Sequence, residues 1–174
     1  SFPALLAEKN ILSGIKVDQG LEDGHGGQVT KGMSGLSLRL GEYKNLGATF
    51  TKWRAVARVG DGFADPAIKE NAERLASYAT AVLQSGMVPM IEPEVLMEGT
   101  HSAEACEGAL IETLAIVFDA LFRAKLNPSE VILKTSMAVS GKSAELRADA
   151  KEVAERTVRA LKTSVPENIG GVVF

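Results

Sequence analysis

With 174 residues, of which 45% are hydrophobic and 24% charged, the chain has the size and balance of one globular domain. Its net charge of −3 argues against a nucleic-acid-binding protein. No apolar run approaches the ~20 residues of a membrane span, so no membrane segment is expected. The single cysteine, Cys106, allows no internal disulfide and suggests a reducing compartment, so we expect a cytoplasmic protein.

Short apolar runs alternate with longer amphipathic runs along the chain. The short runs are rich in Val and Ile and are bounded by Gly, Pro or Asn, which is typical of β-strands. They cover residues 11–17, 50–59, 87–92, 131–134 and 171–174. Between them, apolar residues spaced three or four apart predict helices. These cover residues 36–46, 68–83, 110–122 and 153–161.

Charged residues stand at or near the carboxyl ends of four successive predicted strands. They are, in chain order, Lys16, Asp18, Lys52, Arg54, Glu92, Glu94 and Lys134. The spacing i, i+2 within each pair directs both side chains to one face of a strand. Trp53 lies between two of them and is therefore expected on the opposite face, under the helices. These charges predict either a functional site or a ring of ion pairs that closes the mouth of a barrel.

The alternation of strands and helices predicts a parallel sheet covered by helices, in chain order and with the helices on one face. An open doubly wound sheet and an eight-stranded barrel are the two candidate architectures. An open sheet concentrates its site at one switch point, whereas a barrel converges every strand on one centre. Because the charges are spread evenly over four strands, the pattern favours an α/β (β/α)8 TIM barrel, with one partial domain over residues 1–174.

Lys134 follows an apolar strand, an unusual neighbourhood for a lysine, and we expect it to be buried. A lysine amine is a nucleophile only when neutral, and desolvation and nearby cations both favour the neutral form. Such an amine can form an imine with a carbonyl substrate, and the iminium makes an adjacent C–C bond cleavable. A carboxylate such as Glu92 suits the proton transfers at the carbinolamine. The surplus cations suit a phosphorylated substrate.

Four motifs, in this order and spacing, resemble class I fructose-bisphosphate aldolase. They are IKVDQG (15–20), FTKWRAV (50–56), IEPEVL (91–96) and LKTSM (133–137). GGVVF (170–174) resembles the start of that family's seventh barrel strand. The resemblance covers essentially the whole chain and implies a TIM barrel of which about strands three to seven are present.

The resemblance also implies roles for individual residues. Lys134 would be the Schiff-base lysine, Glu92 the acid/base group, Glu94 its neighbouring carboxylate and Lys52 a lysine of the cleavage chemistry. The residues implied in binding the phosphorylated substrate are Lys16, Arg54 and Asp18. A sugar phosphate substrate and a homo-oligomer are expected, without a cofactor or metal ion, since a zinc-dependent aldolase uses several histidines and this chain has two.

The implied reaction is the reversible cleavage of fructose 1,6-bisphosphate to dihydroxyacetone phosphate and glyceraldehyde 3-phosphate, in glycolysis and gluconeogenesis. Alternatives are another Schiff-base barrel that acts on a different sugar phosphate, and a non-catalytic barrel fragment. The family's first-strand aspartate, its Ser-Gly-Gly phosphate loop, its eighth-strand arginine and its C-terminal tyrosine have no counterpart here, so a longer polypeptide is expected. Animal enzymes have proline and asparagine after the lysine, where this chain has Thr135 and Ser136.

Overall fold

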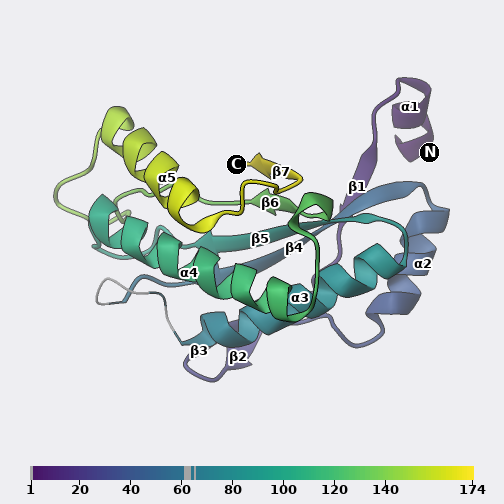
Figure 1. Cartoon of the computed structure of the whole chain (residues 1–174), viewed down its shortest axis with the longest axis horizontal. Helices are drawn as coiled ribbons and strands as arrows, with labels where there is room; N and C mark the ends of the chain where they lie inside the picture. The colour runs from purple at the N-terminus through teal and green to yellow at the C-terminus, as the bar shows by residue number, and fades with distance from the viewer. Residues whose placement is uncertain (1, 61–63, 65) are drawn as a thin grey trace.

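The computed structural model describes residues 2–60, 64 and 66–174 (Figure 1). Its strands are β1 Ser13–Lys16, β2 Leu21–Gly24, β3 Gly27–Thr30, β4 Ala48–Ala57, β5 Val88–Val95, β6 Ile132–Lys134 and β7 Gly171–Val173. Its helices are α1 Phe2–Glu8, α2 Leu36–Asn45, α3 Ala67–Gln84, α4 Ala103–Arg123 and α5 Ala150–Ser164, with a 3₁₀ turn η1 at Pro128–Glu130.

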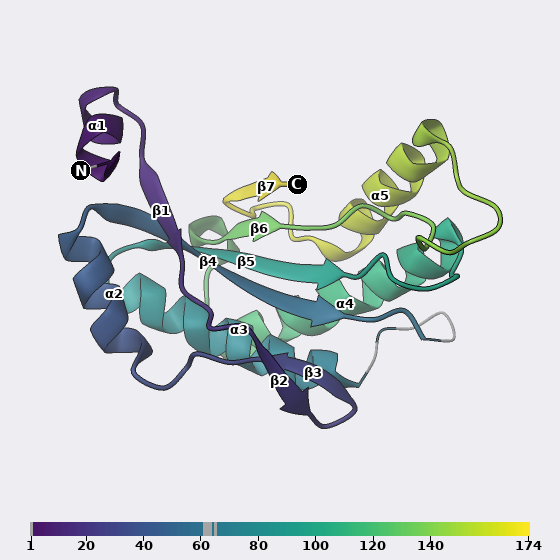
Figure 2. The same ribbon diagram turned by 180° about the vertical axis from the view of Figure 1, so that it is seen from behind.

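Strands β1, β4, β5, β6 and β7 form one sheet in that order, and every neighbouring pair is parallel. The strand order follows the chain, as helical crossovers between successive parallel strands require. Figure 2 shows β4 and β5 in front of α3 and α4, which cover one face of the sheet. The predicted parallel sheet, its strand order and the placement of its helices are confirmed.

The boundaries of the predicted strands differ from the observed ones by a few residues. Strand β5 continues to Val95, three residues beyond the predicted end, so Glu94 lies within the strand. Strand β1 is shorter than predicted and ends at Lys16. Helix α1 was not predicted. The antiparallel hairpin β2–β3 was not predicted either, because its four-residue strands are too short to show an alternating pattern.

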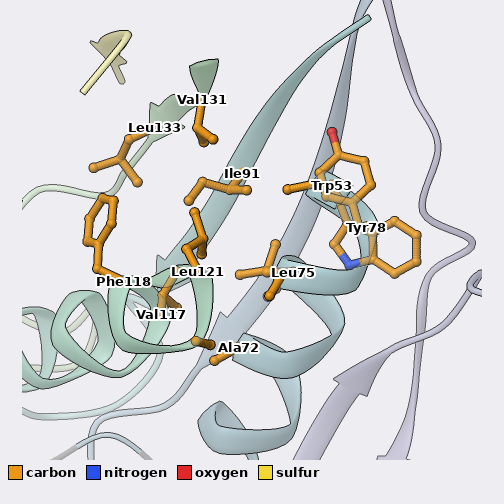
Figure 3. Packing of buried hydrophobic residues seen from close by; sticks show 14 of the residues in the cluster. Trp53, Ala72, Leu75, Tyr78, Ile91, Val117, Phe118, Leu121, Val131 and Leu133 are labelled. Carbon is orange, nitrogen blue, oxygen red and sulfur yellow. The ribbon is translucent and has the colours of Figure 1, made fainter. Parts of the chain in front are cut away.

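The core lies between the sheet and helices α3 and α4. Trp53 of β4 is fully buried against Tyr78 of α3, with ring centroids 5.3 Å apart. Ile91 of β5 lies beside Trp53, and Leu133 of β6 lies beside Ile91, all on the same face (Figure 3). This confirms the predicted orientation of Trp53. Because side chains alternate along a strand, the residues on either side of Trp53 point to the opposite face.

Helix α5 is attached to α4 through a buried carboxylate. Glu107 of α4 accepts hydrogen bonds from Arg156 (2.7 Å) and from Arg159 (2.5 Å) of α5. The hydrogen bond from Arg159 lowers the pKa of Glu107, burial opposes the shift, and the bond from Arg156 adds to it. Folding therefore favours the ionised carboxylate, so this stabilisation is present above the ordinary glutamate pKa of 4.5 and is lost as the pH falls through the lowered value.

We expect Glu107→Gln to lower the free energy of unfolding at pH 7 by about 1.5–3 kcal/mol, the range for hydrogen bonds to charged groups. The difference from the wild type should begin to narrow below pH 4.5, where the carboxylate of the unfolded chain becomes protonated, and should be smallest below the lowered pKa of the folded state. Urea unfolding between pH 3 and pH 7 measures this, with Glu152→Gln as the control because Glu152 is half-exposed and pairs with Arg156 on its own helix. Equal losses in both variants, or a difference independent of pH, would contradict this account of the α4–α5 contact.

Candidate active site

The face of the sheet opposite the helices carries the predicted charged residues. Lys52 and Arg54 alternate with Trp53 on β4, and Glu92 lies beside Arg54 in the register of β4 and β5. Lys134 is the last residue of β6. Three adjacent strands therefore direct ionisable side chains to one face, because successive side chains of a strand point to opposite sides.

Glu92 is the centre of this group of charges. Its Oε1 accepts a hydrogen bond of 2.7 Å from Nζ of Lys134, and its Oε2 forms an ion pair with Nζ of Lys52. The side chain of Glu92 is only 9% exposed. One buried carboxylate thus holds two amines from the two neighbouring strands, and the predicted contact of Glu92 with Lys134 is present.

The two lysines determine the charge of Glu92. Burial alone would raise the pKa of Glu92, but hydrogen bonds from Lys134 and Lys52 outweigh it and hold the pKa below its usual value. Glu92 is therefore a carboxylate at neutral pH. It lies at hydrogen-bond distance from the Lys134 amine and can accept a proton there.

Lys134 is more exposed than the sequence indicates, since 36% of its side chain is accessible. The prediction that Lys134 is buried is wrong. Leu133, one residue earlier, is fully buried under the helices. Lys134 points to the other face of the sheet, where its stem is partly covered and its amine contacts Glu92.

Two further ion pairs flank this centre. Arg54 Nε lies 2.5 Å from Oε2 of Glu94, which follows Glu92 by two residues on β5. The hydrogen bond to Glu94 raises the pKa of Arg54, although burial opposes the shift, so the guanidinium keeps its charge. Lys16, next to Lys52 in the register of β1 and β4, has a half-exposed side chain and pairs with Asp18.

Asp18 is the most buried of the predicted site residues, with 3% of its side chain exposed. Besides Lys16, its carboxylate accepts a hydrogen bond of 3.2 Å from the backbone N–H of Arg54. A second, longer bond of 3.4 Å comes from the backbone of Gly20. The arrangement suits Asp18 to orienting Lys16 and fixing the end of β1 against β4.

The remaining sequence signals lie outside this group. Cys106 of α4 is buried, and burial raises the pKa of its thiol, so the sulfur stays protonated. In the described part of the chain, no cluster of three or more His, Cys, Asp or Glu side chains could hold a metal ion. Among the same residues, no helix has the length and apolar character that crossing a membrane would need.

Comparison with known proteins identifies relatives over the whole chain. The family model "Fructose-bisphosphate aldolase class-I" matches residues 1–174. A probable fructose-bisphosphate aldolase class 1 of Xanthomonas campestris is 44% identical over 99% of this chain and 53% of its own length. Fructose-bisphosphate aldolase C-B of Danio rerio is 38% identical over 100% of this chain and 49% of its own length.

A solved structure matches the fold as well. Fructose-bisphosphate aldolase of Plasmodium falciparum superposes with a TM-score of 0.92 and 36% sequence identity. The match covers 98% of this chain and 51% of that chain. The chain thus spans about half the length of the relatives that it matches.

Proposed function

The chain belongs to the class I fructose-bisphosphate aldolase family, and on this basis we propose that the complete protein cleaves fructose 1,6-bisphosphate reversibly to dihydroxyacetone phosphate and glyceraldehyde 3-phosphate. The five parallel strands are consecutive strands of the TIM barrel of this family. The observation that carries the proposal is Glu92, which holds the amines of Lys134 and Lys52 on the face of the sheet that turns inward in a barrel.

In the proposed reaction, the neutral Lys134 amine attacks the carbonyl carbon of the open-chain sugar. The resulting carbinolamine loses water and leaves an iminium ion, in which the nitrogen has replaced the carbonyl oxygen. Glu92 accepts the proton that the ammonium of Lys134 must lose before the attack, because its carboxylate already accepts a hydrogen bond from that nitrogen. The same carboxylate then serves the proton transfers that expel water.

The carbon next to the iminium carbon is bonded to a carbon that carries a hydroxyl group. The iminium ion allows the bond between these two carbons to break. The electron pair of that bond moves toward the positively charged nitrogen and leaves an enamine on Lys134. The substrate hydroxyl on the departing fragment gives its proton to the Glu92 carboxylate, which is ionised again once water has left, and its carbon becomes the aldehyde. Protonation and hydrolysis of the enamine release the second product. Lys52 faces this position with a charged amine beside Glu92, which suits it to stabilising negative charge on substrate oxygens during cleavage.

The cations at the edge of the group are the proposed phosphate ligands. Arg54 and Lys16 both have partly exposed side chains, and each is paired with one carboxylate. A guanidinium or ammonium that exchanges a carboxylate for a phosphate keeps its charge balanced. Asp18 is proposed to act through Lys16, whose amine it holds.

We expect Arg54→Ala and Lys16→Ala each to raise the KM for fructose 1,6-bisphosphate by about 10- to 100-fold, which corresponds to one lost hydrogen bond to a charged group. The effect should diminish at high salt, because screening weakens the same attraction in the wild type. Steady-state kinetics at two ionic strengths measure it. Lys151→Ala is the control, since Lys151 is exposed and pairs with Glu155 on α5, outside the group. A KM unchanged in both site variants would refute their assignment to the phosphate.

The reaction itself is tested with the purified complete protein, fructose 1,6-bisphosphate and other sugar phosphates, in an assay that detects dihydroxyacetone phosphate. We expect cleavage of the bisphosphate, and covalent inactivation when borohydride is added together with the substrate. A clear preference for another sugar phosphate would favour a different Schiff-base aldolase. Neither cleavage nor inactivation would favour a non-catalytic protein. The homo-oligomer and the cytoplasmic location stay predictions.

A further inference from the structure

Lys134 lies at a point where the sheet stops holding β6 to β5. The register of these two strands contains only the pairs Met90–Ile132 and Ile91–Leu133. Glu92 and Lys134 come one residue later on their strands, beyond the last of these pairs. Lys134 is paired with Val173 of β7 on its other side, so on the β5 side its distance from Glu92 depends on how the segments that follow β5 and β6 are held together.

Those two segments are joined by a ladder of backbone hydrogen bonds, formed by residues 97–101 after β5 and residues 141–143 after β6, which we term the loop clasp. The N–H groups of Gly141, Lys142 and Ser143 donate to the carbonyl oxygens of His101 (2.9 Å), Met97 (2.7 Å) and Gly99 (3.0 Å), respectively. Neither segment is a helix or strand, so these bonds do not arise from the sheet.

The loop clasp requires a glycine at position 141. A Cβ atom on Gly141 would lie 2.3 Å from the carbonyl oxygen of Gly99 and 2.7 Å from its carbonyl carbon. The backbone of Gly141 does not have a positive φ, so its conformation does not demand glycine. Glycine is needed there because two backbones approach each other closely. Non-bonded carbon atoms prefer about 3.5–4.0 Å, so alanine would have to push the segments apart by roughly 1 Å.

Side-chain hydrogen bonds also join the chain after β6 to the end of β5 and to the loop clasp. The backbone N–H of Val95, at the end of β5, donates to Oγ of Ser136 at 3.1 Å. His101 has a hydrogen bond to the backbone of Val139. The loop clasp and these bonds together form a continuous connection from the end of β5 to the chain that follows Lys134.

We propose that the loop clasp positions Lys134 against Glu92, and that Gly141 is a positioning residue for imine formation. The inference rests on the proposed function, because it concerns the step in which Lys134 reacts. A displacement of about 1 Å near reacting groups can slow a reaction by as much as about a hundredfold. Gly141 contacts no reacting atom in this account and acts only through the separation of the two segments.

The test compares Gly141→Ala with Gly41→Ala in the complete protein. Gly41 lies in α2 with no atom within 4 Å of a built Cβ, so alanine there is accommodated. In single-turnover borohydride trapping with fructose 1,6-bisphosphate, we expect Gly141→Ala to form the imine about 10- to 100-fold more slowly. The KM of Gly141→Ala should change by less than about threefold, since the substitution removes no contact with the substrate. Gly41→Ala should match the wild type in both. Trapping at the wild-type rate in Gly141→Ala would overturn the proposal.

A second variant covers the outcome in which Gly141→Ala does not fold. Ser136→Ala removes the hydrogen bond to Val95 without introducing a steric clash. Its imine formation should be slower than that of the wild type by about threefold to tenfold, which corresponds to one hydrogen bond. An unchanged rate would count against the positioning role.

A separate measurement distinguishes failure of this proposal from failure of the proposed function. An amine-selective reagent without substrate should label Lys134 at least about threefold faster in the folded Gly141→Ala or Ser136→Ala variant, because an amine that has separated from the Glu92 carboxylate is less covered. Lys151, which is exposed on α5, provides the reference rate in the same digest. A wild type that forms no imine refutes the proposed function, and unchanged labelling of Lys134 refutes the positioning role.

Discussion

Replacement of Lys134 by methionine is expected to abolish covalent trapping and to lower kcat by at least about 10³-fold, as removal of a covalent nucleophile does in other enzymes. Methionine keeps an apolar stem of similar length, so the fold should persist. Lys134→Arg should be equally inactive, because a guanidinium stays protonated and forms no imine. The measurements are the rate of product formation and the yield of borohydride adduct by intact-protein mass spectrometry.

The matched control is Lys151→Met, because Lys151 is a largely exposed lysine on α5. It should keep the activity and the adduct yield of the wild type. Circular dichroism of Lys134→Met should show the secondary structure of the wild type, so that loss of trapping is not a consequence of unfolding. Turnover near the wild-type rate in either Lys134 variant would exclude an obligatory imine at this residue.

Replacement of Glu92 by glutamine should have the second-largest effect, a decrease in kcat of about 10²- to 10⁴-fold, the range for loss of an acid/base group. The amide keeps the size of the side chain but removes the charge that holds Lys134 and Lys52. Imine formation should slow together with turnover, because the first proton transfer at Lys134 uses the same carboxylate. Pre-steady-state trapping separates the two rates.

The pH dependence supplies an independent check on Glu92. Because the pKa of Glu92 is held below its ordinary value of 4.5, its carboxylate should stay ionised down to that pH in the free protein. Protonation of Glu92 should therefore not limit imine formation at pH 5. Glu94→Gln provides the comparison. Glu94 pairs with Arg54, whereas Glu92 pairs with Lys52 and Lys134, so imine formation should slow less in Glu94→Gln than in Glu92→Gln. The reverse order would contradict the role of Glu92.

The part of the site that follows from strand geometry could be predicted from the sequence. On β4, Lys52 and Arg54 alternate with an aromatic residue, and a strand has only two faces, so burial of Trp53 places both cations on the other face. The order of the parallel strands then places Glu92 and Lys134 on neighbouring strands, where the predicted contact between them is observed. These inferences need only the period of two and the strand order.

Contacts between loops could not be predicted in this way. The role of Gly141 in the structure is to let two backbones approach each other. No local pattern encodes that approach, since its partner Gly99 is distant in the sequence. The exposure of Lys134 was missed for a related reason: a run of apolar residues predicts burial on the helix-covered face only, and Lys134 points to the other.

The most direct test of the central claim is to locate the covalent adduct. The complete protein is incubated with fructose 1,6-bisphosphate, reduced with borohydride, digested and analysed by tandem mass spectrometry. The account predicts one stable adduct, on the side-chain nitrogen of Lys134 within the segment LKTSM, and an unmodified Lys52. An adduct on Lys52 or on another lysine, or active enzyme without any adduct, would contradict it.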